Sequence, residues 1–337
     1  MTEVQRADSF PLLPITSHQT IEWCKNLPAH AALPTIFIAS YPKSGTTWLQ
    51  AIVASLLYEN LQGMSAISSS SSSSSSSSFN HISDVSPFYE VDKTWSDDGT
   101  IQPAVTSVHE SIGCRVFNTH LWWNMLPHGA SFKYIYIVRD GKDVVLSFYH
   151  HLSNQAEGGY KGSFDSFLDV WCEGKLAFGK WMTHLNQWHK AFSNGGDDDY
   201  SNSNSDDDHS NITGKCLLLR YEDLVDNLPR EIQKLSNFIF ADVNVSSNTS
   251  NRMSLTSDQL EQMCERLCFD GMKRESSRYQ PVSVTWTNNF QFLRKGCVGD
   301  SIESFTPEQH RKFDNMIEEA HVPEWFKRLN IHKKYKE

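Results

Sequence analysis

The segment from Ser40 to Trp48, with the sequence SYPKSGTTW, combines a lysine, a glycine and several hydroxyl side chains. It lies between a short apolar run and a stretch with apolar residues at helical spacing. A turn from a buried strand into a helix exposes consecutive backbone N–H groups at the positive end of the helix dipole. Lys43 adds a full positive charge, so the segment predicts a site for a phosphate-like anion. A plain strand-to-helix turn capped by Thr46 is the alternative.

The order of residues in this segment differs from that of the common nucleotide-binding loop. Lys43 precedes Gly45, and the chain contains no GxxxxGK[ST] pattern. That pattern carries the lysine and the magnesium-binding hydroxyl of ATP-dependent enzymes. The sequence therefore disfavours a magnesium-dependent kinase.

Two further segments carry cations in patterns that suit phosphate. Arg139 ends an apolar run, and Ser147 follows two helical turns later, so a guanidinium and a hydroxyl converge on one anion. A surface ion pair of Arg139 with Asp140 or Asp143 is the alternative. The tripeptide 294–296, Arg-Lys-Gly, places two cations beside a residue that permits close backbone approach. Basic pairs of this kind are otherwise commonly part of a solvated face.

His120 is the candidate general base. It follows the predicted strand 115–119, at the end of a parallel sheet where ligands bind. An imidazole that titrates near neutrality is able to take a proton from an acceptor hydroxyl. The chain has 14 histidines, most of which are expected to be structural.

Together these segments resemble the cytosolic sulfotransferases. Residues 41–48 are similar to the family's 5′-phosphosulfate loop, and residues 139–151 to its 3′-phosphate strand and helix. Residues 119–127 resemble its catalytic histidine segment, and residues 294–300 its C-terminal phosphate loop. The four motifs occur in the family's order, so the likeness covers nearly the whole chain.

The resemblance implies transfer of a sulfuryl group from 3′-phosphoadenosine 5′-phosphosulfate (PAPS), leaving the product 3′-phosphoadenosine 5′-phosphate (PAP), with no metal. The acceptor would be the hydroxyl or amine of a small lipophilic molecule such as a phenol, steroid or alcohol. His120 and Lys43 would be catalytic, with Lys43 at the bridging oxygen. The implied nucleotide-binding residues are Lys43, Ser44, Gly45, Thr46, Thr47, Trp48, Arg139, Ser147, Tyr221, Phe269, Arg294, Lys295 and Gly296, of which Trp48, Tyr221 and Phe269 would contact the adenine.

The acceptor side departs from the family at two positions. Asn118 stands where the family commonly has a lysine, so it offers a hydrogen bond without charge. Trp122 replaces a usual proline, and it lines the pocket or packs in the core. Phe88, in the acceptor-side loop 86–90, is the third pocket residue expected. We therefore predict a slowed but active enzyme, with a catalytically inactive nucleotide-binding member of the same fold as the alternative.

These side chains must be positioned by alternating strands and helices. Apolar runs predict strands at 35–40, 115–119, 134–138 and 215–220. Helical spacing predicts helices at 46–59, 140–151, 164–181 continuing towards residue 192, 230–240, 257–267 and 307–320. Strand and helix in alternation predict an α/β fold with a central, mostly parallel sheet and helices on both faces. This is also the P-loop-like fold that the resemblance implies.

Composition limits the class of protein further. The chain has 337 residues, of which 39% are hydrophobic, which suits one large domain over 1–337. Low-complexity insertions interrupt it at 65–80, where eleven serines run from Ser68 to Ser78, and at 193–214. The formal net charge of −10 argues against nucleic acid or an anionic membrane as a partner.

The cysteines, the first residues and the C-terminal region predict where the protein is located and whether it forms a dimer. Seven cysteines without a disulfide or zinc spacing indicate reduced thiols, hence a cytoplasmic protein. The first residues lack the features of a secretory signal, and no apolar run approaches the roughly 20 residues of a membrane span. The dimer signature of many animal sulfotransferases matches at Thr306 alone, so a homodimer is left open.

Overall fold

The computed structural model describes residues 10–30, 33–66, 79–129, 131–193, 212–213, 215–241, 255–287, 290–320 and 324–329. The predicted serine run at 68–78 and most of the predicted insertion at 193–214 lie outside these ranges.

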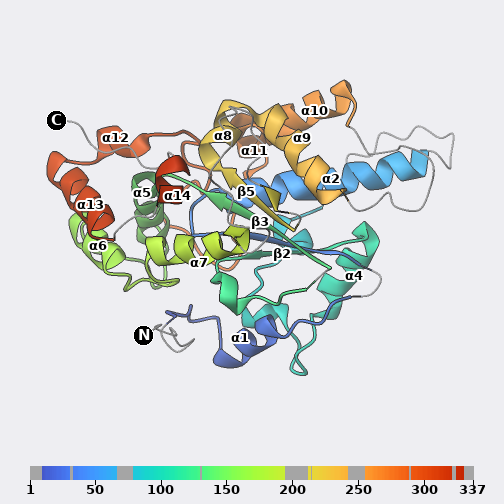
Figure 1. Cartoon of the computed structure of the whole chain (residues 1–337), viewed down its shortest axis with the longest axis horizontal. Coiled ribbons are helices and arrows are strands. Elements are labelled where there is room, and N and C mark those ends of the chain that lie inside the picture. Colours follow the sequence, from blue (N-terminus) through green and yellow to red (C-terminus); the bar gives the residue numbers. More distant parts are fainter. Residues whose placement is uncertain are drawn as a thin grey trace.

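A five-stranded sheet forms the centre of the molecule (Figure 1). Its strands are β1 (Thr35–Ser40), β2 (Arg115–Thr119), β3 (Phe132–Val138), β4 (Ile212–Thr213) and β5 (Cys216–Arg220). They lie in the order β2-β1-β3-β5-β4, and all pairs are parallel except β4 with β5. The predicted mostly parallel sheet is therefore confirmed.

Helices cover both faces of the sheet (Figure 1). The α-helices are α1 (His18–Lys25), α2 (Thr46–Ala66), α3 (Ile82–Val85), α4 (Pro103–Ile112), α5 (Gly141–Ser153), α6 (Phe164–Cys172), α7 (Trp181–Ser193), α8 (Tyr221–Asp226), α9 (Leu228–Ile239), α10 (Ser257–Leu267), α11 (Phe269–Arg274), α12 (Asp300–Ser304), α13 (Pro307–Glu319) and α14 (Glu324–Leu329). Short 3-10 helices are η2 (Asp92–Thr94), η3 (Trp123–Met125) and η4 (Ser276–Arg278).

Each face of the sheet has its own hydrophobic core. Alternate residues of β1 divide between them: Ile36 and Ile38 pack with α2, α9 and α10, whereas Phe37 packs with α5, α6 and α7. Every residue of β1 is buried, because both of its faces are covered. This burial explains why the strand reads as a continuous apolar run in the sequence.

One predicted helix is wrong. The sequence predicts a continuous helix over 164–181, but α6 ends at Cys172 and α7 begins at Trp181. Gly174 adopts a left-handed φ of 74° and the Lys175 N–H donates to the Val170 carbonyl, a geometry that terminates helices. Phe178, with a φ of 71°, is also left-handed. The apolar spacing continues across this break, which is why the pattern resembles one helix.

Candidate active site

The carboxyl ends of the parallel strands collect the predicted site residues at one edge of the sheet. The loop 41–45 and the first residues of α2 follow β1, His120 follows β2, Arg139 follows β3 and Tyr221 follows β5. The register aligns these ends, since Ala39 pairs with Thr119, and Val138 with Arg220. The sheet thus brings together residues that lie up to 180 positions apart in the sequence.

The loop between β1 and α2 has the backbone of an anion cradle. Lys43 and Gly45 have φ angles of 69° and 105°, which turn the chain sharply before α2 begins. A Cβ on Gly45 would lie 2.8 Å from the Tyr221 ring, so glycine is required there. Ser44 is buried, and its Oγ has no hydrogen-bond partner among the described residues. A buried hydroxyl without a partner is available to donate a hydrogen bond to an anion.

Lys43 points its ammonium group into a cluster of basic and aromatic side chains. Its Nζ lies 3.3 Å from Nδ1 of His151 and 4.3 Å from the centre of the Phe292 ring. Burial, together with the charges of Arg139 and Arg294, lowers the pKa of Lys43 to about 7. A bound anion would restore its full charge.

The hydrogen bonds of His120 fix its tautomer. Nδ1 lies 2.7 Å from the backbone carbonyl of Ser40. A carbonyl only accepts, so Nδ1 carries the proton and Nε2 keeps a free lone pair. Burial lowers the pKa of His120 to about 4. The hydrogen bond to Ser40 raises this pKa, whereas the positive charge of Lys43 lowers it. The imidazole is therefore neutral at pH 7, as a general base requires.

The backbone of His120 is held on both sides by residues that the sequence analysis did not identify. Its N–H donates to Oε1 of Glu90 over 2.7 Å, and its carbonyl accepts from Nε2 of His184 over 3.0 Å. Burial raises the pKa of Glu90 to about 7, while the His120 N–H lowers it. Glu90 lies in the acceptor-side loop 86–90 without a predicted role, and His184 lies outside the recognised segments, because both contacts arise from tertiary packing.

Two phenylalanines flank the imidazole of His120. The rings of Phe88 and Phe178 lie edge-on to it at 5.2 and 5.1 Å. Phe88 is a predicted pocket residue, whereas Phe178 was missed. Phe178 has a left-handed backbone, which is rare for a bulky residue and concentrates at functional sites.

Arg139 joins the ends of three segments. It donates to the carbonyls of Lys43 and Cys297 over 3.3 and 3.2 Å, and its guanidinium lies 4.3 Å from the centre of the Tyr221 ring. It also pairs with Asp143 at 3.5 Å, but its side chain is only 11% exposed, so this is no surface pair. Its Nε is buried without a partner among the described residues, a second donor available to an anion.

The C-terminal loop 294–300 docks on the first turn of α5. Asp143 accepts the backbone N–H groups of Gly299 and Ser301 over 2.8 and 2.9 Å. Arg294 and Lys295 both pair with Asp300, which keeps the two cations on the same loop. Ser147 lies half-buried on α5, one turn after Asp143.

The predicted adenine contacts pack beside this loop. Trp48 meets the Tyr221 ring edge-on at 5.6 Å and donates from Nε1 to the Leu267 carbonyl over 2.7 Å. Phe269 lies against Gly296. Tyr221 links these rings to Arg139, so aromatic and cationic groups share one region.

Comparison with known proteins identifies the family. The model of the sulfotransferase domain matches residues 33–196 and 209–330. The chain belongs to the sulfotransferase family. The predicted enzyme class, a sulfotransferase, and the predicted family are therefore confirmed.

Curated relatives are similar over most of their length, and solved structures share the fold. Cytosolic sulfotransferase 1 of Danio rerio is 27% identical, over 92% of this chain and 90% of its own length. Sulfotransferase 1E1 of Homo sapiens is 27% identical, over 89% of this chain and 88% of its own length. The structure of mouse sulfotransferase SULT7A1 complexed with PAP aligns with a TM-score of 0.61, 20% identity and 91% of each chain. The structure of retinol dehydratase in complex with androsterone and inactive cofactor PAP aligns with a TM-score of 0.59 and 18% identity. The alignment covers 88% of this chain and 82% of the retinol dehydratase chain.

Gly296 provides a test of the C-terminal loop of this sulfotransferase. A Cβ there would lie 2.0 Å from the Phe269 ring, on a backbone with a φ of 63°. We expect Gly296→Ala to destabilise the observed conformation of the loop 294–300 by about 1–3 kcal/mol. The Kd for PAP, measured by calorimetry, should rise roughly 5- to 150-fold as a result. Gly113→Ala is the matched control, since its φ is 69° but nothing lies within 4 Å. Equal PAP affinity in both variants would contradict the predicted role of the loop.

Asn118 and Trp122, the other two predicted residues of the acceptor pocket, differ in whether their side chains pack in the core. Asn118 lies on β2 beside Ile38, and its Oδ1 is buried without a partner among the described residues. Trp122 is 4% exposed and packs edge-on against Phe10 at 5.0 Å. The indole therefore belongs to the core, whereas the Asn118 amide retains hydrogen-bonding capacity.

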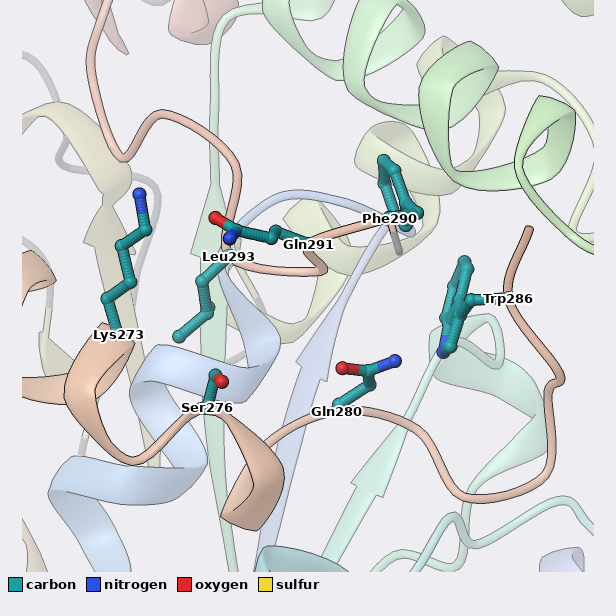
Figure 2. A pocket seen from close by; sticks show the side chains of 7 residues that line it. All are labelled: Lys273, Ser276, Gln280, Trp286, Phe290, Gln291 and Leu293. Atoms are coloured by element: carbon teal, nitrogen blue, oxygen red, sulfur yellow. The ribbon is translucent and has the colours of Figure 1, made fainter. Parts of the chain in front are cut away.

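A cavity of about 540 Å³ lies between α11 and the segment that follows η4 (Figure 2). Its walls are Lys273, Ser276, Gln280, Trp286, Phe290, Gln291 and Leu293. Figure 2 shows Lys273, Ser276 and Gln280 on one side, and the aromatic rings at one end. Trp286 connects this cavity to the surroundings of Lys43, because the centres of the Trp286 and His151 rings lie 5.1 Å apart and His151 contacts Lys43.

Proposed function

We propose that this sulfotransferase transfers the sulfuryl group of PAPS to a hydroxyl or amine of a small lipophilic acceptor, in the cytoplasm. The observation that carries the proposal is the placement of the free Nε2 of His120 and the ammonium of Lys43 at one edge of the sheet. Solved structures of the same fold contain PAP, which supports this donor. Within the described residues, no helix is long and apolar enough to cross a membrane.

The residues at this edge fit a nucleotide with two phosphate groups. Buried donors without partners, Ser44 Oγ and Arg139 Nε, suit anions. The loop residues 43–47 would hold the 5′ side, and Arg139, Ser147 and 294–296 the 3′-phosphate. Trp48, Tyr221 and Phe269 would contact the adenine. When bound, PAPS supplies the activated sulfuryl group.

The chain's own residues supply the proton transfer and the stabilisation of charge. Nε2 of His120 takes the proton of the acceptor hydroxyl as its oxygen attacks the sulfur, and the Ser40 carbonyl keeps Nδ1–H in place. The ammonium of Lys43 and the N–H groups of its loop stabilise the negative charge that develops on the leaving phosphate oxygen. Phe88 and Phe178 provide apolar walls beside His120, which favour a lipophilic acceptor.

The activity is expected to depend on pH through both groups. His120, with a pKa of about 4, is a competent base above that pH, so activity falls as pH drops through 4. Lys43, with a pKa of about 7, loses its charge above neutrality, so kcat/KM for PAPS falls as pH rises through 7. Bound anion raises the pKa of Lys43, so kcat should decline only at higher pH. Glu90 also has a pKa of about 7, so its titration overlaps with that of Lys43. The variant Lys43→Arg separates the two groups. Arginine stays charged, so the loss of kcat/KM at alkaline pH should disappear if Lys43 causes it.

Residue 118 tests the predicted slowing of the enzyme. Asn118→Lys adds a charged hydrogen bond to the transferring group, so we expect kcat to rise about 5- to 30-fold. The same change at a remote position, Asn237→Lys on α9, serves as the control for added charge. An unchanged or lower kcat in Asn118→Lys would contradict this role.

An acceptor screen decides between an active enzyme and an inactive nucleotide-binding protein. PAPS labelled in its sulfate is incubated with phenols, steroids, aliphatic alcohols and amines, with a reaction lacking acceptor as the control. We expect labelled product with lipophilic acceptors. Tight binding of PAP without transfer to any acceptor would instead support the inactive alternative. A preference for saccharides over phenols would overturn the proposed acceptor class.

A further inference from the structure

The hydrogen bond between Lys43 and His151 has no place in the reaction described above. His151 lies on α5, two turns beyond Asp143, and the resemblance to the family implies no role for it. Its Nδ1 lies 3.3 Å from Nζ of Lys43. We infer that His151 is a positioning residue, whose neutral imidazole accepts a hydrogen bond from Lys43 and holds the catalytic ammonium at the donor site. This inference rests on the proposed function of Lys43.

The position of His151 is fixed by packing from a second segment. Thr287 N–H donates to the Asn154 carbonyl and Ala156 N–H donates to the Thr285 carbonyl, both over 2.8 Å, so residues 285–287 are fastened to the end of α5. This contact places the Trp286 ring 5.1 Å from the His151 ring. The imidazole is therefore held in place before any ligand binds.

The aromatic ring of Phe292 completes the holder for the ammonium. It lies 4.3 Å from Nζ of Lys43 and 6.0 Å from the centre of the His151 ring. A phenyl face attracts a cation but takes no hydrogen bond comparable to that of a nitrogen lone pair. Within the described ranges, the hydrogen bond of Lys43 Nζ goes to His151.

The charges around Lys43 make this acceptor important. Arg139 beyond β3 and Arg294 in the C-terminal loop repel the ammonium, whereas the imidazole of His120 beyond β2 is neutral at pH 7. Burial and the charge of Lys43 keep the pKa of His151 well below its ordinary value. His151 is therefore neutral, and its Nδ1 lone pair opposes the tendency of Lys43 to lose its proton.

Lysine reactivity in the nucleotide-free protein tests this pair directly. Competitive labelling with acetic anhydride, read by mass spectrometry across pH, gives the pKa of Lys43. We expect His151→Leu to lower that pKa by about one unit, so that the reactive amine fraction at pH 7 rises from about one half to about nine tenths. His151→Gln, of similar size but with an accepting oxygen, should stay near the wild-type value. His128→Leu is the matched control, because that exposed histidine contacts Trp123 instead.

Kinetics then separate this inference from the proposed function. If the wild-type protein transfers sulfate, kcat/KM for PAPS at pH 7 should fall roughly fivefold in His151→Leu and recover in His151→Gln, with its alkaline limb shifted to lower pH only in the leucine variant. A wild-type protein that neither binds PAP nor transfers sulfate refutes the proposed function, while the labelling experiment still decides the role of His151.

Two results would overturn the inference. One is an unchanged pKa of Lys43 in a folded His151→Leu variant. The other needs no variant: long-range ¹H–¹⁵N spectra of the wild-type protein report the tautomer of each histidine. Nδ1 of His151 should be the unprotonated nitrogen, and a proton on Nδ1 would exclude it as the acceptor from Lys43.

Discussion

His120→Ala is expected to lower kcat for sulfuryl transfer by about 10²- to 10⁴-fold, the range typical for loss of a general base. The reason lies in the geometry of the imidazole. Its Nδ1–H is engaged by the Ser40 carbonyl and its pKa is about 4, so the free Nε2 is ready to take a proton at neutral pH. Without it, the acceptor hydroxyl must attack while still protonated. Initial rates with saturating PAPS measure the effect.

The binding of PAP distinguishes a chemical defect from a structural one in this variant. Because the His120 side chain contacts Ser40 through Nδ1 alone, at the carbonyl and the hydroxyl of Ser40, the donor loop should survive its removal. The Kd for PAP should therefore change less than about threefold. His128→Ala removes an exposed imidazole and should retain wild-type kcat. A His120→Ala enzyme that keeps more than a tenth of wild-type kcat would show that another group is the base.

Lys43→Met is expected to lower kcat by about 10²- to 10³-fold, as loss of a preorganised charge at a developing anion does. Methionine keeps much of the length and bulk of the side chain and removes only the ammonium. That ammonium is buried beside Phe292 and His151, where electrostatic interactions are stronger than in water. The loss should therefore appear in the chemical step, measured by single-turnover transfer.

Lys295→Met is the contrasting variant. Lys295 is half exposed and already paired with Asp300, and its proposed role is to bind the 3′-phosphate. Its removal should raise the KM for PAPS a few-fold and leave kcat close to wild type, as loss of uniform binding does. If Lys43→Met instead raised KM with an unchanged kcat, Lys43 would be a binding residue only.

The strands were predictable from the sequence because a strand buried on both faces is a run of apolar residues. Thr35–Ser40 and Arg115–Thr119 have the predicted bounds, and β3 is only two residues longer than expected. The helix predicted across 164–181 failed, since the left-handed conformations of Gly174 and Phe178 leave the apolar period intact. Periodicity reports which side of an element is buried, but it does not report where the backbone reverses.

The candidate site was predictable where local sequence fixes local backbone. The loop 41–47 and the segment at Arg139 follow strands directly, so their place at the sheet edge follows from the topology. The roles of Glu90, Phe178 and His151 could not be found this way, although Glu90 and His151 lie in the recognised segments 86–90 and 139–151. Each reaches His120 or Lys43 from a separate element, and those contacts depend on how elements pack.

The docking of the loop 294–300 onto Asp143 has a consequence for synthesis on the ribosome. Chains emerge from the N-terminal end, so the cradle at Lys43 and the turn at Asp143 leave the exit tunnel long before Ser301 does. Only when the N–H groups of Gly299 and Ser301 reach Asp143 does the donor site have both of its ends. On the proposed function, affinity for PAP would therefore be acquired late by the nascent chain, and it would report that synthesis has passed residue 301.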